Sequence, residues 1–349
     1  MTRVRARGED VRRFILEELE KHPSDISKVT ARHFGITRQA VNKHLQRLSS
    51  EKAIIESGKT RSRAYKLGAL GEWGAFYYIE PELAEDVVWR EAISPALGPM
   101  PDNVLHIWHY GFTEMFNNAI DHSEGNQIHV SIKKTAVTTE MLLMDDGIGI
   151  FKKIQTRLGL LDERHAIIEL SKGKLTTDPN NHTGEGIFFT SRVFDQFDIL
   201  SGGVYYLHKF ADPTDWIAER ERFQSGTSVW MKLNNHTSRT VRKIQDQFTS
   251  GDDFAFSKTI VPVRLSRYGN ENLISRSQAK RLLARVEVFK IVVLDFAEVP
   301  SIGQAFADEI FRVFPRRHPE VELRFAHASS EVRRMIERAK TGAIDSGSG

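Results

Sequence analysis

The stretch FTEMFNNAIDHS, residues 112–123, combines two different stripes on one expected helix. Its apolar residues recur three and four positions apart, which is the spacing of a helix that packs one face on a core. Glu114, Asn118 and His122 stand four positions apart, so a carboxylate, an amide and an imidazole share another face. A solvated helix surface would mix Lys with Glu instead, and we therefore expect this polar stripe to face a ligand.

A second motif follows two predicted strands, QIHVSIKK and TEMLLM, the second of which runs straight into DDGIGI. Aspartate and glycine are poor strand formers, so their place at a buried strand end needs a separate explanation. Gly147 and Gly149 permit a tight backbone path and the close approach of a ligand. Asp145 would present an acceptor to whatever is bound there.

Two glycine pairs complete the pattern. Gly184 and Gly186 precede a predicted helix in NNHTGEGIFFTSRVFDQF, where backbone N–H groups at a helix start can hold a phosphate. Gly226 and Thr227 open the last strand of the region, GTSVWMKL. Each glycine pair alone is weak evidence, but four motifs in this order are not expected by chance.

In this order the motifs resemble the ATP-binding fold of the GHKL superfamily, which includes gyrase, heat-shock chaperones, histidine kinases, mismatch-repair ATPases and anti-sigma-factor kinases. The resemblance covers about residues 85–235 and is closest to the anti-sigma-kinase and ATPase versions, because Glu114 is present. It implies an α/β sandwich with a mixed sheet and helices on one face. It also implies bound ATP and Mg²⁺.

The resemblance assigns roles to single residues. Asn118 would bind Mg²⁺ that bridges the phosphates, and Glu114 would act as the catalytic base toward the γ-phosphate. Asp145 would accept a hydrogen bond from the adenine amino group, with Thr227 nearby. The role of His122 stays open between contacting the phosphates and ending the helix. The remaining cofactor-binding residues are Gly147, Gly149, Gly184 and Gly186.

The segment between the two glycine boxes, about residues 151–182, resembles the mobile lid of this fold. Lys172 and Lys174 are candidate phosphate contacts, although exposed lysines are usually only solvated. His182 stands where many relatives have another glycine. A phosphoacceptor histidine on a separate helix pair is not evident, which argues against a histidine kinase.

The first 67 residues are basic, with 16 Lys and Arg against 8 Asp and Glu, while the whole chain carries only +3. Predicted helices DVRRFILEELEKH, ISKVTARHFG and TRQAVNKHLQRLSSEK are followed by a basic hairpin, AIIESGKTRSRAYKLG. This order resembles a winged helix-turn-helix that binds double-stranded DNA, with a protein-docking module as the alternative. The expected DNA contacts are Arg38, Gln39, Asn42, Lys43, Arg47, Lys59, Arg61 and Arg63.

The hairpin also contains AIIESGKT, which fits a loose P-loop pattern. A P-loop must lead from a strand into a helix, whereas RSRAYKLG alternates as a second strand. We therefore reject a nucleotide site there.

Beyond residue 255, strands alternate with helices, which predicts a small α/β layer with largely parallel strands. VVLDFAEVPSIGQAFADEIFRVF resembles the STAS-like domains related to anti-sigma-factor antagonists. The position of their regulatory phosphoserine corresponds to Gln304, and Ser301 is expected to cap the helix instead.

The predicted fold class is α+β in several domains. The expected parts are a winged helix-turn-helix at 1–70, a linker at 71–84, a GHKL domain at 85–240, a linker at 241–254, a STAS-like domain at 255–341 and a flexible tail at 342–349. The absence of cysteine, of a signal peptide and of an apolar membrane-length run favours a cytoplasmic protein without a membrane partner.

Three functions remain open from the sequence: an ATP-dependent DNA-binding regulator of the bacterial type, a serine/threonine kinase acting on a STAS-domain partner, and a scaffold that binds nucleotide without hydrolysis. The sequence does not decide whether ATP is hydrolysed, and it leaves a homodimer open.

Overall fold

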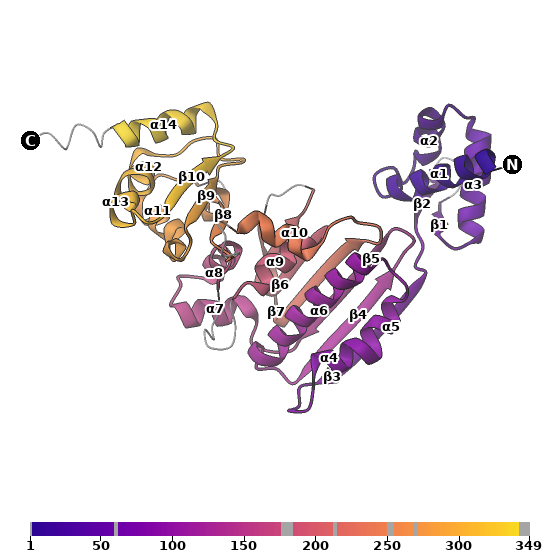
Figure 1. The fold of residues 1–349 in the computed structure, drawn as a ribbon, viewed down its shortest axis with the longest axis horizontal. Coiled ribbons are helices and arrows are strands. Elements are labelled where there is room, and N and C mark those ends of the chain that lie inside the picture. Colours follow the sequence, from indigo (N-terminus) through magenta and orange to yellow (C-terminus); the bar gives the residue numbers. More distant parts are fainter. Residues whose placement is uncertain are drawn as a thin grey trace, which may run out of the picture.

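The computed structural model describes residues 2–58, 62–175, 184–211, 215–249, 255–267 and 271–341. They form an N-terminal head, a central part and a C-terminal part, which follow one another from right to left in Figure 1. Helices and three sheets are combined in one chain, so the predicted α+β class is confirmed. Within these ranges no helix is both long enough and apolar enough to cross a membrane.

The head consists of three helices and one hairpin. Gly35 ends the second helix with a φ of 62°, and the Thr37 hydroxyl accepts a hydrogen bond of 3.2 Å from Ala40 N at the start of the third. Ile15, Leu45 and other apolar residues form a small separate core. The elements are α1 (Thr2–Glu18), α2 (Ile26–Phe34), α3 (Arg38–Ser50), β1 (Ile54–Ser57) and β2 (Ala64–Leu67).

The central part is built on a five-stranded sheet in the order β3-β4-β5-β7-β6. All four strand pairings are antiparallel, so the predicted mixed sheet is wrong for the described residues. A parallel neighbour needs a crossover connection, whereas β4–β5 and β6–β7 are hairpins that return directly. The strands are β3 (Gly71–Tyr78), β4 (Gln127–Lys134), β5 (Thr138–Asp145), β6 (Gln196–Lys209) and β7 (Trp216–Asn234).

The segment 71–84 was predicted as a linker, and the structure corrects this prediction. Its first eight residues form β3, the edge strand that pairs with β4 from Gly71↔Lys134 to Tyr78↔Gln127. The glycines in GALGEWGAF indicated a junction, but Trp73 and Tyr77 pack on the core of the central part.

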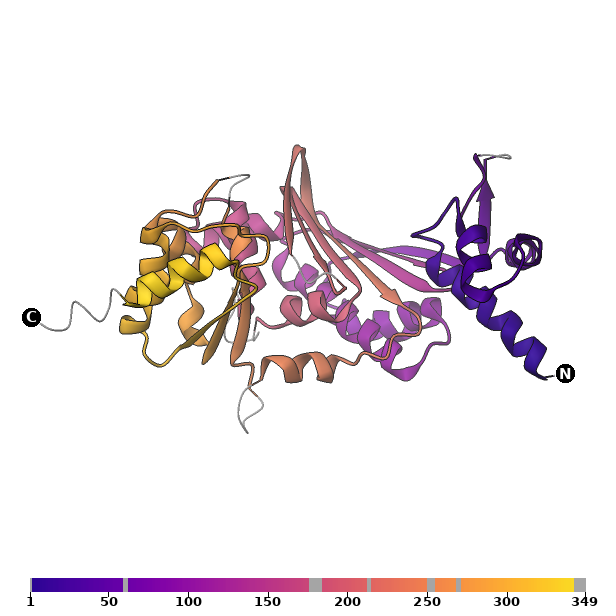
Figure 2. The same cartoon turned by 90° about the horizontal axis from the view of Figure 1, so that it is seen from above.

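The helices of the central part lie on one face of this sheet, as seen from above in Figure 2. The apolar stripe of α6 (Asp102–His122), including Phe112 and Phe116, packs against Ile128, Val130 and Ile132 of β4 in one core. The polar stripe of α6, with Glu114 and Asn118, therefore lies on a different face of the helix from its buried apolar stripe. Its neighbours are α4 (Glu85–Val88), a π-helix (Trp89–Ile93), α5 (Ser94–Leu97), α9 (Gly186–Val193) and α10 (Val241–Gln245).

Two helices occupy most of the predicted lid: α7 (Ile150–Leu158) and α8 (Glu163–Lys172). Every residue of α8 from His165 to Lys172 is buried, so this half is packed rather than solvated. Residues 176–183, including His182, lie outside the described residues.

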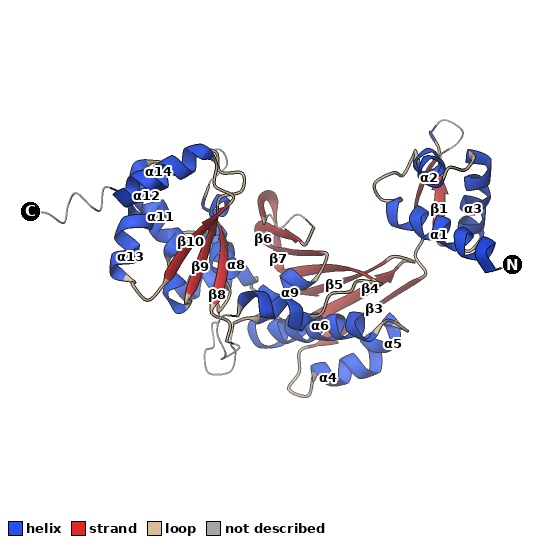
Figure 3. Ribbon diagram, turned by 45° about the horizontal axis from the view of Figure 1, so that its top comes forward, coloured by secondary structure: helices blue, strands red, loops and turns tan. Residues whose placement is uncertain are grey.

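The C-terminal part has a three-stranded parallel sheet in the order β10-β9-β8, in agreement with the predicted parallel α/β layer (Figure 3). Gly303, rather than Ser301, is the N-cap residue of α12, so the prediction that Ser301 caps this helix is wrong. Gln304 is the first residue of α12. The elements are β8 (Lys258–Pro262), α11 (Arg276–Leu283), β9 (Ile291–Asp295), α12 (Gln304–Asp308), a π-helix (Glu309–Val313), α13 (Phe314–Arg317), β10 (Glu322–Ala326) and α14 (Ser330–Thr341).

The central and C-terminal parts share one continuous hydrophobic core. The predicted linker 241–254 instead begins with α10 and a 3-10 helix (Asp246–Phe248), whose Phe248 is buried. Phe248 and Phe256 both pack on Phe188 of α9, with ring centroids 4.9 and 4.7 Å apart. Aromatic burial across the chain junction joins these two parts.

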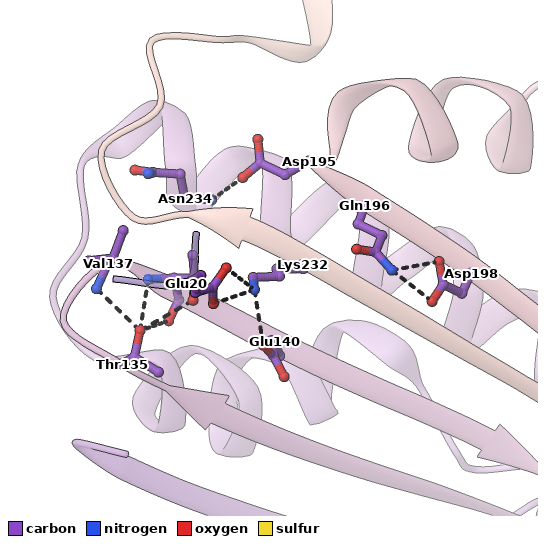
Figure 4. A network of polar contacts seen from close by, with 10 residues as sticks. Glu20, Thr135, Val137, Glu140, Asp195, Gln196, Asp198, Lys232 and Asn234 are labelled. Atoms are coloured by element: carbon purple, nitrogen blue, oxygen red, sulfur yellow. Dashed lines mark hydrogen bonds and ion pairs between the residues drawn. The ribbon is translucent and has the colours of Figure 1, made fainter. Parts of the chain in front are cut away.

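The contact between the head and the sheet is smaller than the core that the central and C-terminal parts share (Figure 4). Lys232 Nζ of β7 lies 2.7 Å from Glu20 Oε1 of the head and 3.6 Å from Glu140 Oε1 of β5. The Glu20 side chain is 54% exposed, so this ion pair contributes at most about 1 kcal/mol. Ala136, in the β4–β5 turn, also packs on the core of the head.

Candidate functional site

A cavity of about 320 Å³ lies between α6, α7, α9 and the sheet, in the size range of small-molecule sites. It is the place where residues predicted from separate motifs meet. Glu114, Asn118, Asp145, Gly184, Gly186 and Thr227 line it together with His122.

The apolar floor of the cavity comes from both layers of the central part. Met115 of α6, Leu143 of β5, Ile154 of α7, Ile199 of β6 and Val229 of β7 line it. A flat apolar slot of this kind suits an aromatic ring system, provided that a polar group at its edge fixes the orientation.

Asp145 supplies that polar group at the end of β5. Its Oδ1 accepts hydrogen bonds from Gly147 N at 3.0 Å and from Thr227 N at 3.1 Å. Burial raises the pKa of this carboxyl, although the two backbone hydrogen bonds oppose the rise. The carboxyl is thus fixed by backbone donors from two segments while it lines the cavity.

Two glycines are needed for this close packing. A Cβ at Gly147 would overlap the backbone oxygen of Ser123, and a Cβ at Gly226 would overlap the backbone oxygen of Asp145. Gly226 also has a φ of 74°, which side chains rarely adopt. Gly149, by contrast, is the N-cap residue of α7 and does not line the cavity, and neither does Gly147.

Glu114 lies against the start of α9, because a Cβ at Gly186 would overlap its carboxylate. Backbone N–H groups at a helix start attract negative charge, and the carboxylate lies where an anionic ligand would meet them. Asn118, one turn further along α6, lines the same cavity. Among the described residues, none makes a hydrogen bond with the Asn118 side chain.

Lys153 is a cavity residue that sequence reasoning missed. Its Nζ donates to His122 O at 2.8 Å and lies 3.0 Å from Glu124 Oε1, so it ties α7 to the end of α6. The lysine stands four positions after Gly149 and could have been found from that spacing, since one helical turn brings it back toward the glycine box. It brings a positive charge to a cavity that otherwise has two carboxylates.

Lys172 does not reach the cavity, which corrects its prediction as a phosphate contact. Its Nζ donates to Glu169 Oε1 at 2.7 Å and to Ala284 O of the C-terminal part at 2.6 Å. Thr259 of β8 donates to Lys172 O at 2.6 Å. These contacts form a buried seam between α8 and the C-terminal part.

Lys174 also lies against the C-terminal part and not in the cavity. Its ammonium lies over the ring of Phe289 at 5.1 Å, on the C-terminal side of the seam. Neither lysine lines the cavity.

The predicted DNA contacts on α3 share one property: they are exposed on the helix whose other face carries buried Val41, Leu45 and Leu48. Arg47 pairs with Glu51 at 2.8 Å. In the hairpin, Arg63 pairs with Glu56 at 2.8 Å, and Lys59 and Arg61 lie outside the described residues. The exposed residues of α3 are Arg38, Gln39, Asn42, Lys43 and Arg47.

The structure of the hairpin also argues against a P-loop at AIIESGKT. β1 pairs with β2 antiparallel from Ile54↔Leu67 to Ser57↔Ala64. A P-loop would need a helix where β2 lies, so this pattern has no nucleotide-binding context.

Comparison with known proteins identifies the C-terminal part. Residues 278–333 match the family described as STAS-like domain of unknown function (DUF4325). This match covers α11 through the beginning of α14 and confirms the predicted STAS-like domain. No curated protein matches the chain.

Proposed function

We propose that this protein is a DNA-binding regulator whose central cavity binds Mg-ATP and thereby controls the winged-helix head and the STAS-like domain. One observation carries the nucleotide part: residues from four separated motifs line a single cavity of about 320 Å³. The GHKL resemblance predicts that these residues converge on one nucleotide site, and the cavity is consistent with that prediction.

Each end of the cavity fits a different part of ATP. Asp145, fixed by two backbone donors, would accept from the adenine amino group over the apolar floor. The start of α9 and Lys153 would meet the phosphates. The ligand would bring the negative charge that Lys153 and the helix start can stabilise.

The donor set fits a magnesium ion that arrives with the nucleotide. Across the described ranges, no group of three or more His, Cys, Asp or Glu side chains is placed to hold a metal. Mg²⁺ commonly uses one or two protein oxygens, substrate phosphates and water. The Asn118 amide, to which no described residue is hydrogen-bonded, would supply the protein oxygen, and the ion would neutralise phosphate charge.

Glu114 is the residue on which hydrolysis depends. For it to act as a base, its carboxylate must leave the start of α9 and accept a proton from an attacking water or hydroxyl. ATP bound at that position would displace the carboxylate. Before ATP binds, the contact with the start of α9 would hold Glu114 in place.

The seam at α8 supports control of the STAS-like domain. Leu170 of α8 lines the cavity, while Lys172, two residues on, donates to Ala284 O. A nucleotide that shifts α8 would therefore shift the STAS-like domain, provided that its affinity differs between the two arrangements.

The exposed polar residues of α3 support DNA binding by the head. Arg38 and Lys43 are free to meet phosphates, and Gln39 and Asn42 have amide groups suited to base edges. The capped turn between α2 and α3 fits a helix-turn-helix.

The test combines turnover with DNA binding. We expect wild-type protein to bind Mg-ATP and to change its DNA affinity on binding. Asn118→Ala should bind Mg-ATP more weakly and should show no change in DNA affinity at the Mg-ATP concentration that saturates wild type. Glu114→Ala should keep nucleotide binding and lose turnover, if turnover exists. DNA affinity that is identical with and without Mg-ATP, together with unchanged domain protection in hydrogen exchange, would contradict regulation and leave a nucleotide-bound scaffold.

The STAS-like match favours a second candidate, a serine/threonine kinase of the anti-sigma type. Incubation with labelled ATP and STAS-domain partners, followed by mass spectrometry, should then show phosphoserine or phosphothreonine that is lost in Glu114→Ala. Gln304 at the start of α12 cannot accept a phosphate, so the target would be another protein.

A further inference from the structure

A groove of about 270 Å³ opens on the STAS-like domain. It lies between the end of α11, the turn that follows it, and the π-helix and α13. It shares no lining residue with the central cavity. The two sites are therefore separate, and this groove does not depend on the nucleotide proposal.

The rim of the groove carries three cationic side chains and one exposed carboxylate, that of Glu287. Lys280 of α11 and Arg317 of α13 are exposed, and neither makes a hydrogen bond or ion pair with any residue that the structure describes. Arg285 adds a third cation, whose Nε lies 3.8 Å from Glu169 Oε2. Arg285 adopts a φ of 61°, in the left-handed region that non-glycine residues rarely occupy outside turns and functional sites.

The groove also contains an unusual carboxylate. Glu309 is only 6% exposed, yet its side chain has no hydrogen-bond or ion-pair partner among the described residues. Because Glu309 also lines the groove, its carboxylate offers acceptors to a ligand bound there. Glu309 is also the first residue of the π-helix, a distortion that is frequent at functional sites.

We propose that this groove binds a small phosphate ester that carries a hydroxyl group. The phosphate would lie between Lys280, Arg317 and Arg285, which favour phosphate oxygens through charge-assisted hydrogen bonds. The hydroxyl would donate to the carboxylate of Glu309, which lines the groove. The dianion of methyl phosphate fits less well, because it has no O–H group to donate to Glu309.

The volume sets the size of the ligand. A groove of about 270 Å³ is smaller than the pockets that hold drug-sized ligands, which suits a short polyol phosphate. His318, stacked on Phe314 with ring centroids 4.6 Å apart, closes one side of the groove.

The experiment is a calorimetric titration of the full chain at pH 8 with glycerol 3-phosphate and, separately, with methyl phosphate, a phosphate ester without a hydroxyl group. Saturating Mg-ATP is present in all titrations so that the central cavity is filled. The titrations are repeated with Asn118→Ala, and any difference from wild type is assigned to phosphate binding in the central cavity. We expect glycerol 3-phosphate to bind at least tenfold more tightly than methyl phosphate, since a hydrogen bond to a charged group is worth about that factor.

Three variants separate the roles of the groove residues. Lys280→Gln with Arg317→Gln should weaken both probes at least about tenfold, because two charge-assisted contacts are lost. Glu309→Gln should weaken only glycerol 3-phosphate. Arg334→Gln, an exposed arginine on α14, is the matched control and should leave both affinities unchanged.

The proposal is overturned if wild type binds neither probe at millimolar concentration. It is also overturned if the double variant binds glycerol 3-phosphate as tightly as Arg334→Gln does. Circular dichroism of each variant identifies loss of folding, and Lys280 and Arg317 are exposed, so their replacement leaves the core intact.

Discussion

Replacing Lys172 by Met tests whether α8 is held to the STAS-like domain by a buried charge. The side chain is 2% exposed and that of its partner Glu169 is 5% exposed. The variant removes the hydrogen bonds to Glu169 Oε1 and Ala284 O. Among the described residues, the buried carboxylate of Glu169 then keeps a single ion-pair partner, Arg285, at 3.8 Å. Removing one partner of a buried pair costs about 3–5 kcal/mol, and we expect a loss of unfolding free energy in that range.

The assay is denaturant unfolding combined with hydrogen exchange at α8 and α11, because a chain of several parts need not unfold in one step. Exchange at the seam should rise in Lys172→Met. Adding Glu169→Leu should recover most of the loss, since an apolar pair replaces the ion pair. Lys152→Met on the exposed face of α7 is the control.

An exposed lysine changes stability by no more than about 0.5 kcal/mol, which is the expected effect of Lys152→Met. If Lys172→Met costs as little as this control, the seam does not hold α8, and the proposed transmission from the cavity to the STAS-like domain loses its structural basis.

Three further predictions concern the cavity and the head. Burial raises the pKa of Asp145 above the ordinary range of an aspartate, and adenine needs the carboxylate form. ATP affinity should therefore fall on acidification at a higher pH than for an ordinary aspartate, and ATP binding should release a proton; calorimetry in two buffers should detect this release in wild type but not in Asp145→Asn. Gly147→Ala should lose ATP binding and destabilise the protein by about 2 kcal/mol or more, whereas Gly71→Ala, where a Cβ meets nothing within 4 Å, should change little; equal effects on thermal unfolding would contradict the packing account. Arg38→Ala should weaken DNA binding and lower the salt-dependence slope by about 0.9, while Lys243→Ala on α10 should not; fluorescence anisotropy against salt concentration measures both, and an unchanged slope for Arg38→Ala would contradict a phosphate contact.

The sign of the Asp145 effect on stability follows from the same pKa. A raised pKa means that the folded chain holds this proton more tightly than the unfolded chain does. The stabilisation from this group is therefore present below the unfolded pKa and is lost as pH rises through the folded value. ATP binding works in the opposite direction, because it favours the ionised form.

Sequence periodicity predicted the elements around the cavity well. QIHVSIKK corresponds to β4 (Gln127–Lys134), and the helix expected from about Asp102 is α6 (Asp102–His122). Strict alternation and a long apolar stripe are local signals, so they survive without knowledge of the fold. The convergence of Glu114, Asn118 and Asp145 was predicted only through the resemblance.

The errors fall where long-range packing decides the structure. Glycines in 71–84 indicated a junction, but pairing with β4 makes this segment an edge strand. Lys172 appeared to be an exposed loop lysine, and only the fold shows that Ala284, more than a hundred positions away in the sequence, accepts its hydrogen bond. No local pattern could have indicated this partner.

The same limit applies to the groove on the STAS-like domain. Glu309 reads as one charged residue on an amphipathic helix, and its burial at the groove becomes visible only when α11 and α13 are placed beside it. Conversely, Gln304 was recognised from its position at the helix start, because that signal is local.

The most direct test of the account is calorimetric titration of ATP into wild type and Asn118→Ala, each with Mg²⁺ and with EDTA. We predict that Mg²⁺ strengthens ATP binding by wild type, and that Asn118→Ala loses most of this enhancement while its affinity in EDTA stays close to that of wild type. Failure of wild-type protein to bind ATP under either condition, or an equal Mg²⁺ effect in both proteins, would contradict the account.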